Sequence, residues 1–192
     1  MQIITTNLTK RYKNQLVLNQ WSFSIQSGQR IALMGESGCG KTTFLRILMQ
    51  LEQPDSGTIE GLQGVRVSAV FQQARLCPTL TALENVLLVA EKSQNQQQKA
   101  KLFLEQLGLD TTAQNKRVGK LSGGQRQRVA IARALMIPFD ILLLDEAFKG
   151  LDPENQSKAI SLVLEQTQQK MLLAVTHDTK EAEQLNAVIC KM

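Results

Sequence analysis

A glycine-rich segment with one lysine and a threonine contains residue types that bind phosphate. Residues 35–42 fit the pattern GxxxxGK[ST] and stand between an apolar, strand-like stretch and a segment with helical periodicity. Glycine lets the backbone curl so that successive N–H groups point inward, and the helix start adds its positive end. Lys41 would reach the β- and γ-phosphates of a nucleotide, and the Thr42 hydroxyl would ligate Mg²⁺. The predicted nucleotide-binding residues of this segment are Gly35, Glu36, Ser37, Gly38, Cys39, Gly40, Lys41, Thr42 and Thr43.

Two carboxylates follow a second apolar run. The residues 141–144 are all isoleucine or leucine, and Asp145 and Glu146 come directly after them. Ligand sites in open α/β sheets lie at the carboxyl ends of such strands. Asp145 can hold magnesium through water, and Glu146 can polarise an attacking water. An acidic pair alone is often a solvated turn, but with the phosphate loop upstream it predicts hydrolysis.

A third motif, LSGGQ, opens a segment with helical periodicity. Ser122 is well placed to cap the helix, and Gly123 and Gly124, followed by Gln125, allow a close backbone approach. The motif is therefore a second helix start suited to an anion, although by itself it could be an ordinary helix start.

Strand-like and helix-like stretches alternate along the chain and must position these residues. Strands are predicted at 3–8, 17–25, 30–34, 65–71, 141–144, 171–176 and 187–190. Helices are predicted at 41–50, 81–91, 97–107, 123–136 and 153–168. Apolar runs without alternation are typical of strands covered on both faces, so the pattern predicts an α/β fold with a mainly parallel sheet.

The middle of the chain departs from this alternation. From about residue 75 to 136 the helices have no convincing strand between them, which predicts one domain, 1–192, with an inserted helical lobe. The glutamine-rich residues 93–98 are expected to be a solvated connector between two helices. Most of the apolar residues Leu76, Leu80, Leu83, Val86 and Leu87 are expected in the core of this lobe. Arg126, Arg128 and Arg133 are expected on a solvated helix face.

Composition limits the classes of protein. The 192 residues, 43% hydrophobic and 20% charged, suit one compact domain, and no run approaches the roughly 20 apolar residues that span a membrane. Three scattered cysteines and one histidine lack the spacing of a disulfide framework or a zinc site, which predicts a cytoplasmic protein. The net charge of +5 suits phosphate ligands, nucleic acid or an anionic membrane, but only 4% of residues are aromatic. Nucleic acid is therefore not an expected partner.

The order of phosphate loop, LSGGQ and apolar run with Asp-Glu resembles the nucleotide-binding subunit of ABC transporters over essentially the whole chain. The resemblance implies the ABC ATPase fold: a P-loop NTPase with a mainly parallel sheet, an antiparallel β edge and an inserted α-helical lobe. It also implies ATP and Mg²⁺ as cofactors and ATP hydrolysis coupled to transport.

Further residues match motifs of this family. Gln72 matches the Q-loop glutamine that contacts the metal and the attacking water, and Asp152 matches the end of the D-loop. His177 matches the switch histidine at the γ-phosphate, and Tyr12 matches the aromatic residue that stacks on adenine. The resemblance thus implies Glu146, His177 and Gln72 as catalytic residues. It implies Thr42, Gln72 and Asp145 as magnesium ligands, and residues 122–125 as the signature that faces the ATP of a second subunit.

The chain departs from the family at a few positions. Ala147 stands where the family usually has proline, and Phe148-Lys149-Gly150 is a less common approach to the D-loop. The chain ends soon after His177, so the regulatory domain of many importer subunits is expected to be absent.

The implied partners are a second ABC ATPase subunit, as a homodimer, a transmembrane permease and, for an importer, a solute-binding protein. The protein would be peripheral on the inner face of the cell membrane through the permease. Residues 70–76 and 80–86 are similar to importers of the nitrate, sulfonate and taurine group, although lipoprotein-release and macrolide-export subunits share much of this sequence. An exporter and a soluble ABC ATPase of iron–sulfur assembly are therefore the alternatives. A GTPase is disfavoured because residues 115–118 lack the aspartate of a guanine-reading NKxD motif.

Overall fold

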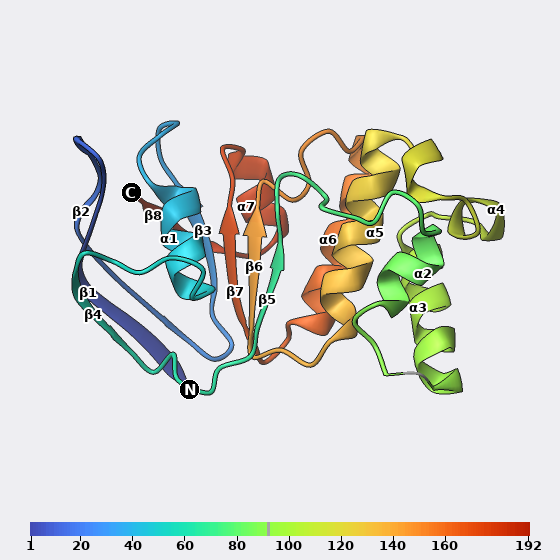
Figure 1. The fold of residues 1–192 in the computed structure, drawn as a ribbon, viewed down its shortest axis with the longest axis horizontal. Helices are drawn as coiled ribbons and strands as arrows, with labels where there is room; N and C mark the ends of the chain where they lie inside the picture. The colour runs from blue at the N-terminus through green and yellow to red at the C-terminus, as the bar shows by residue number, and fades with distance from the viewer. Residues whose placement is uncertain (92) are drawn as a thin grey trace. The chain divides into compact units, whose positions relative to one another are not determined.

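A computed structural model describes residues 1–91 and 93–192, which divide into two compact units. Unit 1 comprises Met1–Val67, Phe139–Asp145 and Gln169–Met192, and unit 2 comprises Ser68–Pro138 and Glu146–Gln168. The strands, labelled in Figure 1, are β1 (Gln2–Tyr12), β2 (Gln15–Gln26), β3 (Arg30–Met34), β4 (Ser56–Glu60), β5 (Val67–Val70), β6 (Ile141–Asp145), β7 (Met171–Val175) and β8 (Val188–Lys191). The helices are α1 (Lys41–Leu48), α2 (Ala82–Leu87), α3 (Gln94–Gln106), α4 (Thr111–Gln114), the 3-10 helix η1 (Val118–Lys120), α5 (Gly123–Met136), α6 (Pro153–Gln166) and α7 (Thr179–Gln184).

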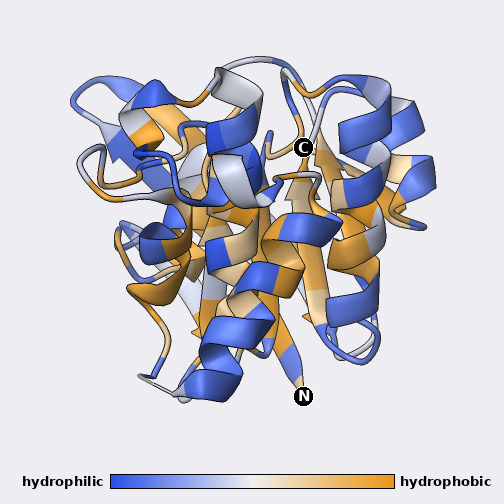
Figure 2. Ribbon diagram, turned by 90° about the vertical axis from the view of Figure 1, so that its right-hand side faces the viewer, coloured by the Kyte–Doolittle hydropathy of each residue, from blue (hydrophilic) through white to orange (hydrophobic). Residues whose placement is uncertain are grey.

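The parallel sheet of unit 1 brings three predicted features to one edge. They are the phosphate loop after β3, Asp145 at the end of β6 and His177 after β7. Strands β6, β7, β3 and β8 lie in this order and pair in parallel. Every residue of β6 and β7 is buried, as their unbroken apolar runs predict. The strands that can be seen behind the helices in Figure 2 are coloured mainly hydrophobic. Because Val175 is in register with both Leu33 and Asp145, the carboxyl ends of β3, β6 and β7 coincide.

A separate antiparallel sheet, in the order β2-β1-β4, forms the predicted β edge. Strand β4 is not among the predicted strands, because it is short, polar and partly glycine. Gly57 has a φ of 96°, and a Cβ there would lie 2.6 Å from the Thr6 carbonyl oxygen, so pairing with β1 requires glycine at this position. On α1, Phe44 packs edge-to-face against Phe23 and Trp21 of β2, with ring centroids 5.2 and 6.2 Å apart.

Helices make up most of unit 2, where α5 packs against α2, α3 and α6. Residues 93–98 are largely exposed to solvent, as predicted, but the prediction that they form a connector is wrong, because α3 begins at Gln94. Ser93 caps this helix by accepting a hydrogen bond from Gln96 N at 3.2 Å, and glutamine is a good helix former. Polar composition alone therefore misplaced the start of α3.

The assignment of the leucines to the core of this region also needs correction. Val86 is buried, but Leu76, Leu80, Leu83 and Leu87 are all half-buried. The short helix α2 buries Ala82, Asn85 and Val86, which leaves its leucines beside that buried face. The sequence analysis also missed α4 and η1, which are too short to show a helical period.

None of the helices in the described part of the chain combines the length and the apolar character needed to cross a bilayer.

Candidate functional site

The loop between β3 and α1 has the backbone that its glycines predict. Gly38 and Gly40 have φ values of 86° and 105°, in the left-handed region. A Cβ on Gly40 would lie 2.6 Å from the Val17 carbonyl oxygen, so no other residue fits there. Gly40 is also the N-cap of α1 and offers no side chain to its first N–H groups. The start of α1 therefore presents backbone donors, the arrangement that binds phosphate.

Lys41 is buried at the start of α1 and turns back over the loop. Its Nζ donates hydrogen bonds to the carbonyl oxygens of Gly35 and Glu36, both at 2.8 Å, and lies 3.7 Å from Cys39 Sγ. The ammonium group thus stabilises the curled loop from inside. A phosphate that enters the loop meets a cation already placed at its centre.

Thr42 and Asp145, which are far apart in the sequence, meet at the edge of the parallel sheet. The Thr42 hydroxyl donates a hydrogen bond to Asp145 Oδ2 at 3.1 Å, and the Asp145 side chain is buried. A hydroxyl and a carboxylate are hard oxygen ligands, and Mg²⁺ is usually held by one or two such groups together with substrate phosphates. The donor set therefore fits Mg²⁺ bound together with a nucleotide. Among residues 1–91 and 93–192, no group of three or more His, Cys, Asp or Glu side chains is arranged to hold a metal ion.

In unit 2, two nitrogen donors converge on the carboxylate of Glu146. Gln72 Nε2 donates to Glu146 Oε2 at 2.9 Å, and Lys149 Nζ lies 2.7 Å from the same oxygen. Glu146 has a φ of 47°, which is uncommon for a residue with a Cβ and is found mainly at functional or tight-turn positions. The structure thus places the predicted Q-loop glutamine against the predicted base.

The predicted signature residues start α5 with a capping box. Ser122 Oγ accepts a hydrogen bond from Gln125 N at 3.2 Å, and Gln125 Oε1 accepts one from Ser122 N at 2.9 Å. Gly123 is exposed and Gly124 half-buried, so backbone at the helix start can be approached closely. The capping role expected for Ser122 is confirmed.

Asp152 caps α6 in the same way. Its side chain accepts hydrogen bonds from the side chain of Asn155 at 2.7 Å and from Asn155 N at 3.0 Å. Both bonds lower the pKa of Asp152 below its ordinary value, and the bond from the Asn155 side chain has the larger effect. The hydrogen bonds therefore favour the ionised form of the predicted D-loop aspartate at the start of α6.

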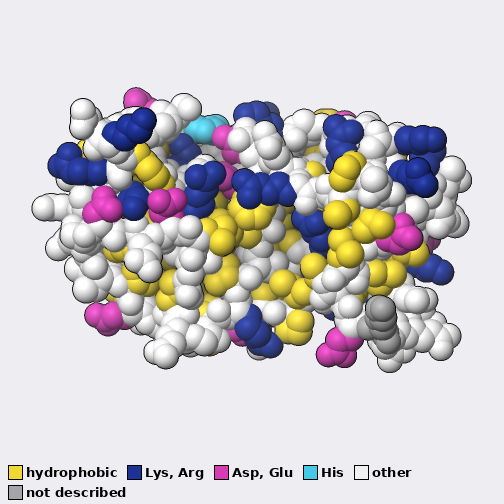
Figure 3. All heavy atoms as spheres, viewed as in Figure 1, with side chains coloured by type: hydrophobic (Ala, Val, Ile, Leu, Met, Phe, Trp, Pro, Cys, Tyr) yellow, Lys and Arg dark blue, Asp and Glu magenta, His cyan; other side chains and the backbone are white. Residues whose placement is uncertain are grey.

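Two further predicted residues, Tyr12 and His177, are exposed in unit 1. Tyr12 ends β1, and the Lys10 ammonium lies 5.6 Å from the centre of its ring. His177 follows β7 at the edge that carries the phosphate loop, and the histidine side chain is visible at the surface in Figure 3. Asp178, the next residue, caps the short helix α7.

The expectation of a solvated arginine face on α5 is wrong for Arg128. Its Nη1 donates to the carbonyl oxygens of Leu107 and Gly108 and, at 2.7 Å, to Asn155 Oδ1. Burial lowers the pKa of this guanidinium. Arg133 is also partly buried and donates to the carbonyl oxygens of Ala74 and Arg75, whereas Arg126 is exposed. Applying the 3.6-residue period of a helix to α5 would have placed Arg126 and Arg128 on different faces.

Sequence reasoning gave Lys149 no role, yet it contacts the predicted base. Its backbone N–H donates to the Glu146 carbonyl oxygen at 3.2 Å, which closes a turn and returns the side chain to the carboxylate. The sequence feature that could have indicated this contact is the position of Lys149, three residues after Glu146 in a segment unusual for the family.

Known families and proteins resemble this chain. The ABC transporter family profile matches residues 18–149. The aliphatic sulfonates import ATP-binding protein SsuB 2 of Pseudomonas syringae pv. tomato is 41% identical, with 90% of this chain and 74% of that protein covered. A probable amino-acid ABC transporter ATP-binding protein of Haemophilus influenzae is 37% identical, with 93% and 79% covered.

A solved structure is similar as well. The ATP-binding cassette MJ0796 has been determined as a dimer after hydrolysis, bound to ADP and phosphate. This chain matches it with a TM-score of 0.83 and 33% identity over 95% of this chain and 90% of that one. The structure and these comparisons together show that the chain belongs to the ABC transporter family, as an ATP-binding and ATP-hydrolysing subunit.

Proposed function

We propose that this chain powers a bacterial importer by hydrolysing ATP at the residues described above, with aliphatic sulfonates as the solute class. The observation that carries the site assignment is the 3.1 Å hydrogen bond between Thr42 and Asp145, which joins the phosphate loop to the end of β6. The direction of transport and the solute class are supported by the relative that imports aliphatic sulfonates.

In the proposed mechanism, residues of unit 1 bind the nucleotide. Lys41 exchanges its two carbonyl partners for the β- and γ-phosphates, and the N–H groups of residues 35–43 surround them. Tyr12 stacks on the adenine, and His177 contacts the γ-phosphate. Thr42 and Asp145 would hold Mg²⁺, which would neutralise negative charge on the phosphate oxygens.

Glu146 is the proposed general base. Its carboxylate accepts a proton from the attacking water while the water oxygen bonds to the γ-phosphorus and the bond to ADP breaks. Gln72 fixes the carboxylate and contacts the water. Each chain has one phosphate loop and one LSGGQ motif, so two copies would pair head to tail, with residues 122–125 and Asp152 facing the partner's ATP.

A matched pair of variants tests these roles. Glu146→Gln should keep ATP binding but lower kcat at least about 100-fold, because the amide cannot accept the proton. An ATP-bound dimer should then accumulate in size-exclusion chromatography. Lys41→Ala should lose ATP binding in a titration. Turnover near the wild-type rate in Glu146→Gln, or wild-type ATP affinity in Lys41→Ala, would contradict the assignment.

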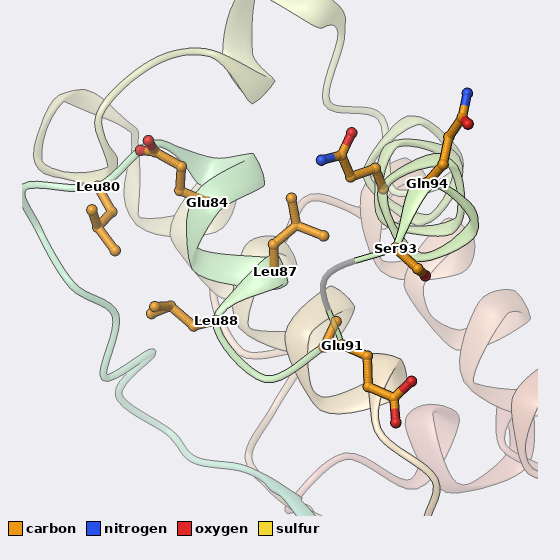
Figure 4. Close-up of a pocket in the computed structure, with 9 residues that line it drawn as sticks. Leu80, Glu84, Leu87, Leu88, Glu91, Ser93 and Gln94 are labelled. Carbon is orange, nitrogen blue, oxygen red and sulfur yellow. The ribbon is translucent and has the colours of Figure 1, made fainter.

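The membrane partner is the second part of the proposal. A cavity of about 640 Å³ in unit 2 lies between α2 and the start of α3, as Figure 4 shows. Leu80, Leu87 and Leu88 give it an apolar wall, and Glu84 and Glu91 add carboxylates. Leu88 is 55% exposed. We assign this groove to a short amphipathic helix of the permease with basic residues, which would hold the chain at the inner face of the membrane.

Two exposed leucines allow a controlled test of the groove. Leu88→Asp should reduce co-purification of the permease encoded by the neighbouring genes at least about fivefold, because a charge replaces an apolar contact. Leu102→Asp is the control, since Leu102 is 51% exposed on α3 and does not line the cavity. Equal loss from both variants, or from neither, would count against the groove.

A further inference from the structure

The carboxylate of Glu146 is held by Lys149 as well as by the glutamine of the Q-loop. Lys149 Nζ and Gln72 Nε2 lie 2.7 and 2.9 Å from the same oxygen, Oε2. Two donors on one oxygen restrict where that oxygen can lie. Gln72 has a family role, whereas the lysine belongs to a segment that departs from the family.

The exposure of the two partners shows that this ion pair contributes little to folding. The Lys149 side chain is 66% exposed and the Glu146 side chain 18% exposed. Ion pairs with so exposed a partner stabilise a fold only slightly, because water screens them and the side chain loses freedom. The ion pair thus stabilises the fold little, but it involves the proposed base. We therefore expect its main effect to be on the reaction.

The backbone fixes this contact in place. Glu146 has a φ of 47°, and the Lys149 N–H donates to the Glu146 carbonyl oxygen at 3.2 Å. The turn thereby brings the side chain of Lys149 back beside the carboxylate of Glu146, three residues earlier in the chain. The buried neighbours Ala147 and Phe148 anchor the turn between them.

We propose that Lys149 is a positioning residue for ATP hydrolysis in this chain. Its ammonium holds Glu146 Oε2 together with Gln72, so that the carboxylate faces the attacking water in a single orientation. The lysine itself transfers no proton and touches no phosphate. This inference depends on the proposed role of Glu146 as the base.

Lys149→Met tests the proposal, since methionine keeps the aliphatic chain and removes the charge. We expect kcat for ATP hydrolysis to fall about fivefold to tenfold, the effect of losing one charge-assisted hydrogen bond from an oriented group. KM and the dissociation constant for ATP should stay within twofold. Lys149→Arg should recover most of kcat because it keeps a cationic donor.

The control uses a similar ion pair away from the site. Lys158 Nζ lies 2.6 Å from Glu154 Oε1 on α6, and Lys158→Met should leave kcat and KM unchanged. Thermal unfolding of all variants should lie within a few degrees of wild type. A kcat in Lys149→Met that is unchanged or raised overturns the proposal, as does a parallel loss of ATP affinity.

A double-variant measurement separates positioning from a general structural effect. In the Glu146→Gln background, Lys149→Met should change the single-turnover rate less than twofold, because the lysine acts through the carboxylate. A further fivefold fall there overturns the proposal. If Glu146→Gln itself retains turnover, the base assignment fails. If it abolishes turnover while Lys149→Met has wild-type kcat, only the inference about Lys149 fails.

Discussion

Single side chains in this protein take their roles from partners that are distant in sequence. Glu146 is held by Gln72, 74 residues earlier, and Asp145 by Thr42, 103 residues earlier. The motifs identified all four residues. Only the fold could show that Gln72 and Lys149 share one carboxylate oxygen, because side-chain direction in a turn with positive φ is not encoded in residue spacing.

The Arg66–Asp140 pair predicts a pH-dependent contribution to stability. Asp140 accepts hydrogen bonds from the Arg66 side chain and backbone, at 2.8 to 3.0 Å, and these lower its pKa from 3.8 to about 2. The stabilisation is therefore complete above about pH 4 and disappears as the pH falls toward 2. Asp140→Asn should lower the free energy of unfolding by about 1 kcal/mol or less at pH 7.

Urea denaturation of wild type and Asp140→Asn at several pH values measures this effect. The difference in the unfolding free energy should be constant between pH 5 and 7 and should shrink below pH 4. A difference that persists unchanged at pH 2.5 would contradict the role of the ionised carboxylate.

At the level of elements, sequence patterns located the buried apolar strands and the long helix α5 well. The predicted bounds of β3 and α5 are those observed, and β6 and β7 differ by one residue at an end. The predictions were wrong where hydrogen bonds hold polar residues in an element, as in β4 and the first turns of α3. Local propensity cannot reveal that β4 pairs with β1, since that pairing is tertiary.

Arg128 links three segments of unit 2. Its guanidinium binds the carbonyl oxygens that follow α3 and the side chain of Asn155 on α6, while its own backbone lies on α5. Arg128→Met should lower the free energy of unfolding by about 2 to 3 kcal/mol, because buried acceptors lose a charged donor.

Chemical denaturation checks this value against Arg126→Met, whose arginine is exposed on the same helix. The control should change the free energy of unfolding by about 0.5 kcal/mol or less, as is usual for surface substitutions. Similar losses in both variants would show that the buried contacts are not the cause.

For the whole molecule, the sequence predicted an α/β fold with a parallel sheet and an antiparallel edge, and both are present. The order of strands could not be predicted, because any of the buried apolar strands could occupy the sheet centre. The division into one domain with an inserted lobe at about residues 75–136 stays a prediction. The compact unit that contains this stretch also includes Glu146–Gln168, so α6 groups with the helices before β6.

The hydrogen bond between Thr42 and Asp145 has a consequence for how strongly the protein can take up magnesium. Two of the proposed ligands are already in contact at 3.1 Å, and the Asp145 side chain is buried and restricted. Little side-chain conformational entropy is therefore lost when the ion arrives. The affinity for the metal is then governed mainly by dehydration of the ion and by the phosphates that accompany it, so this subunit should gain magnesium with its nucleotide and release it with the product.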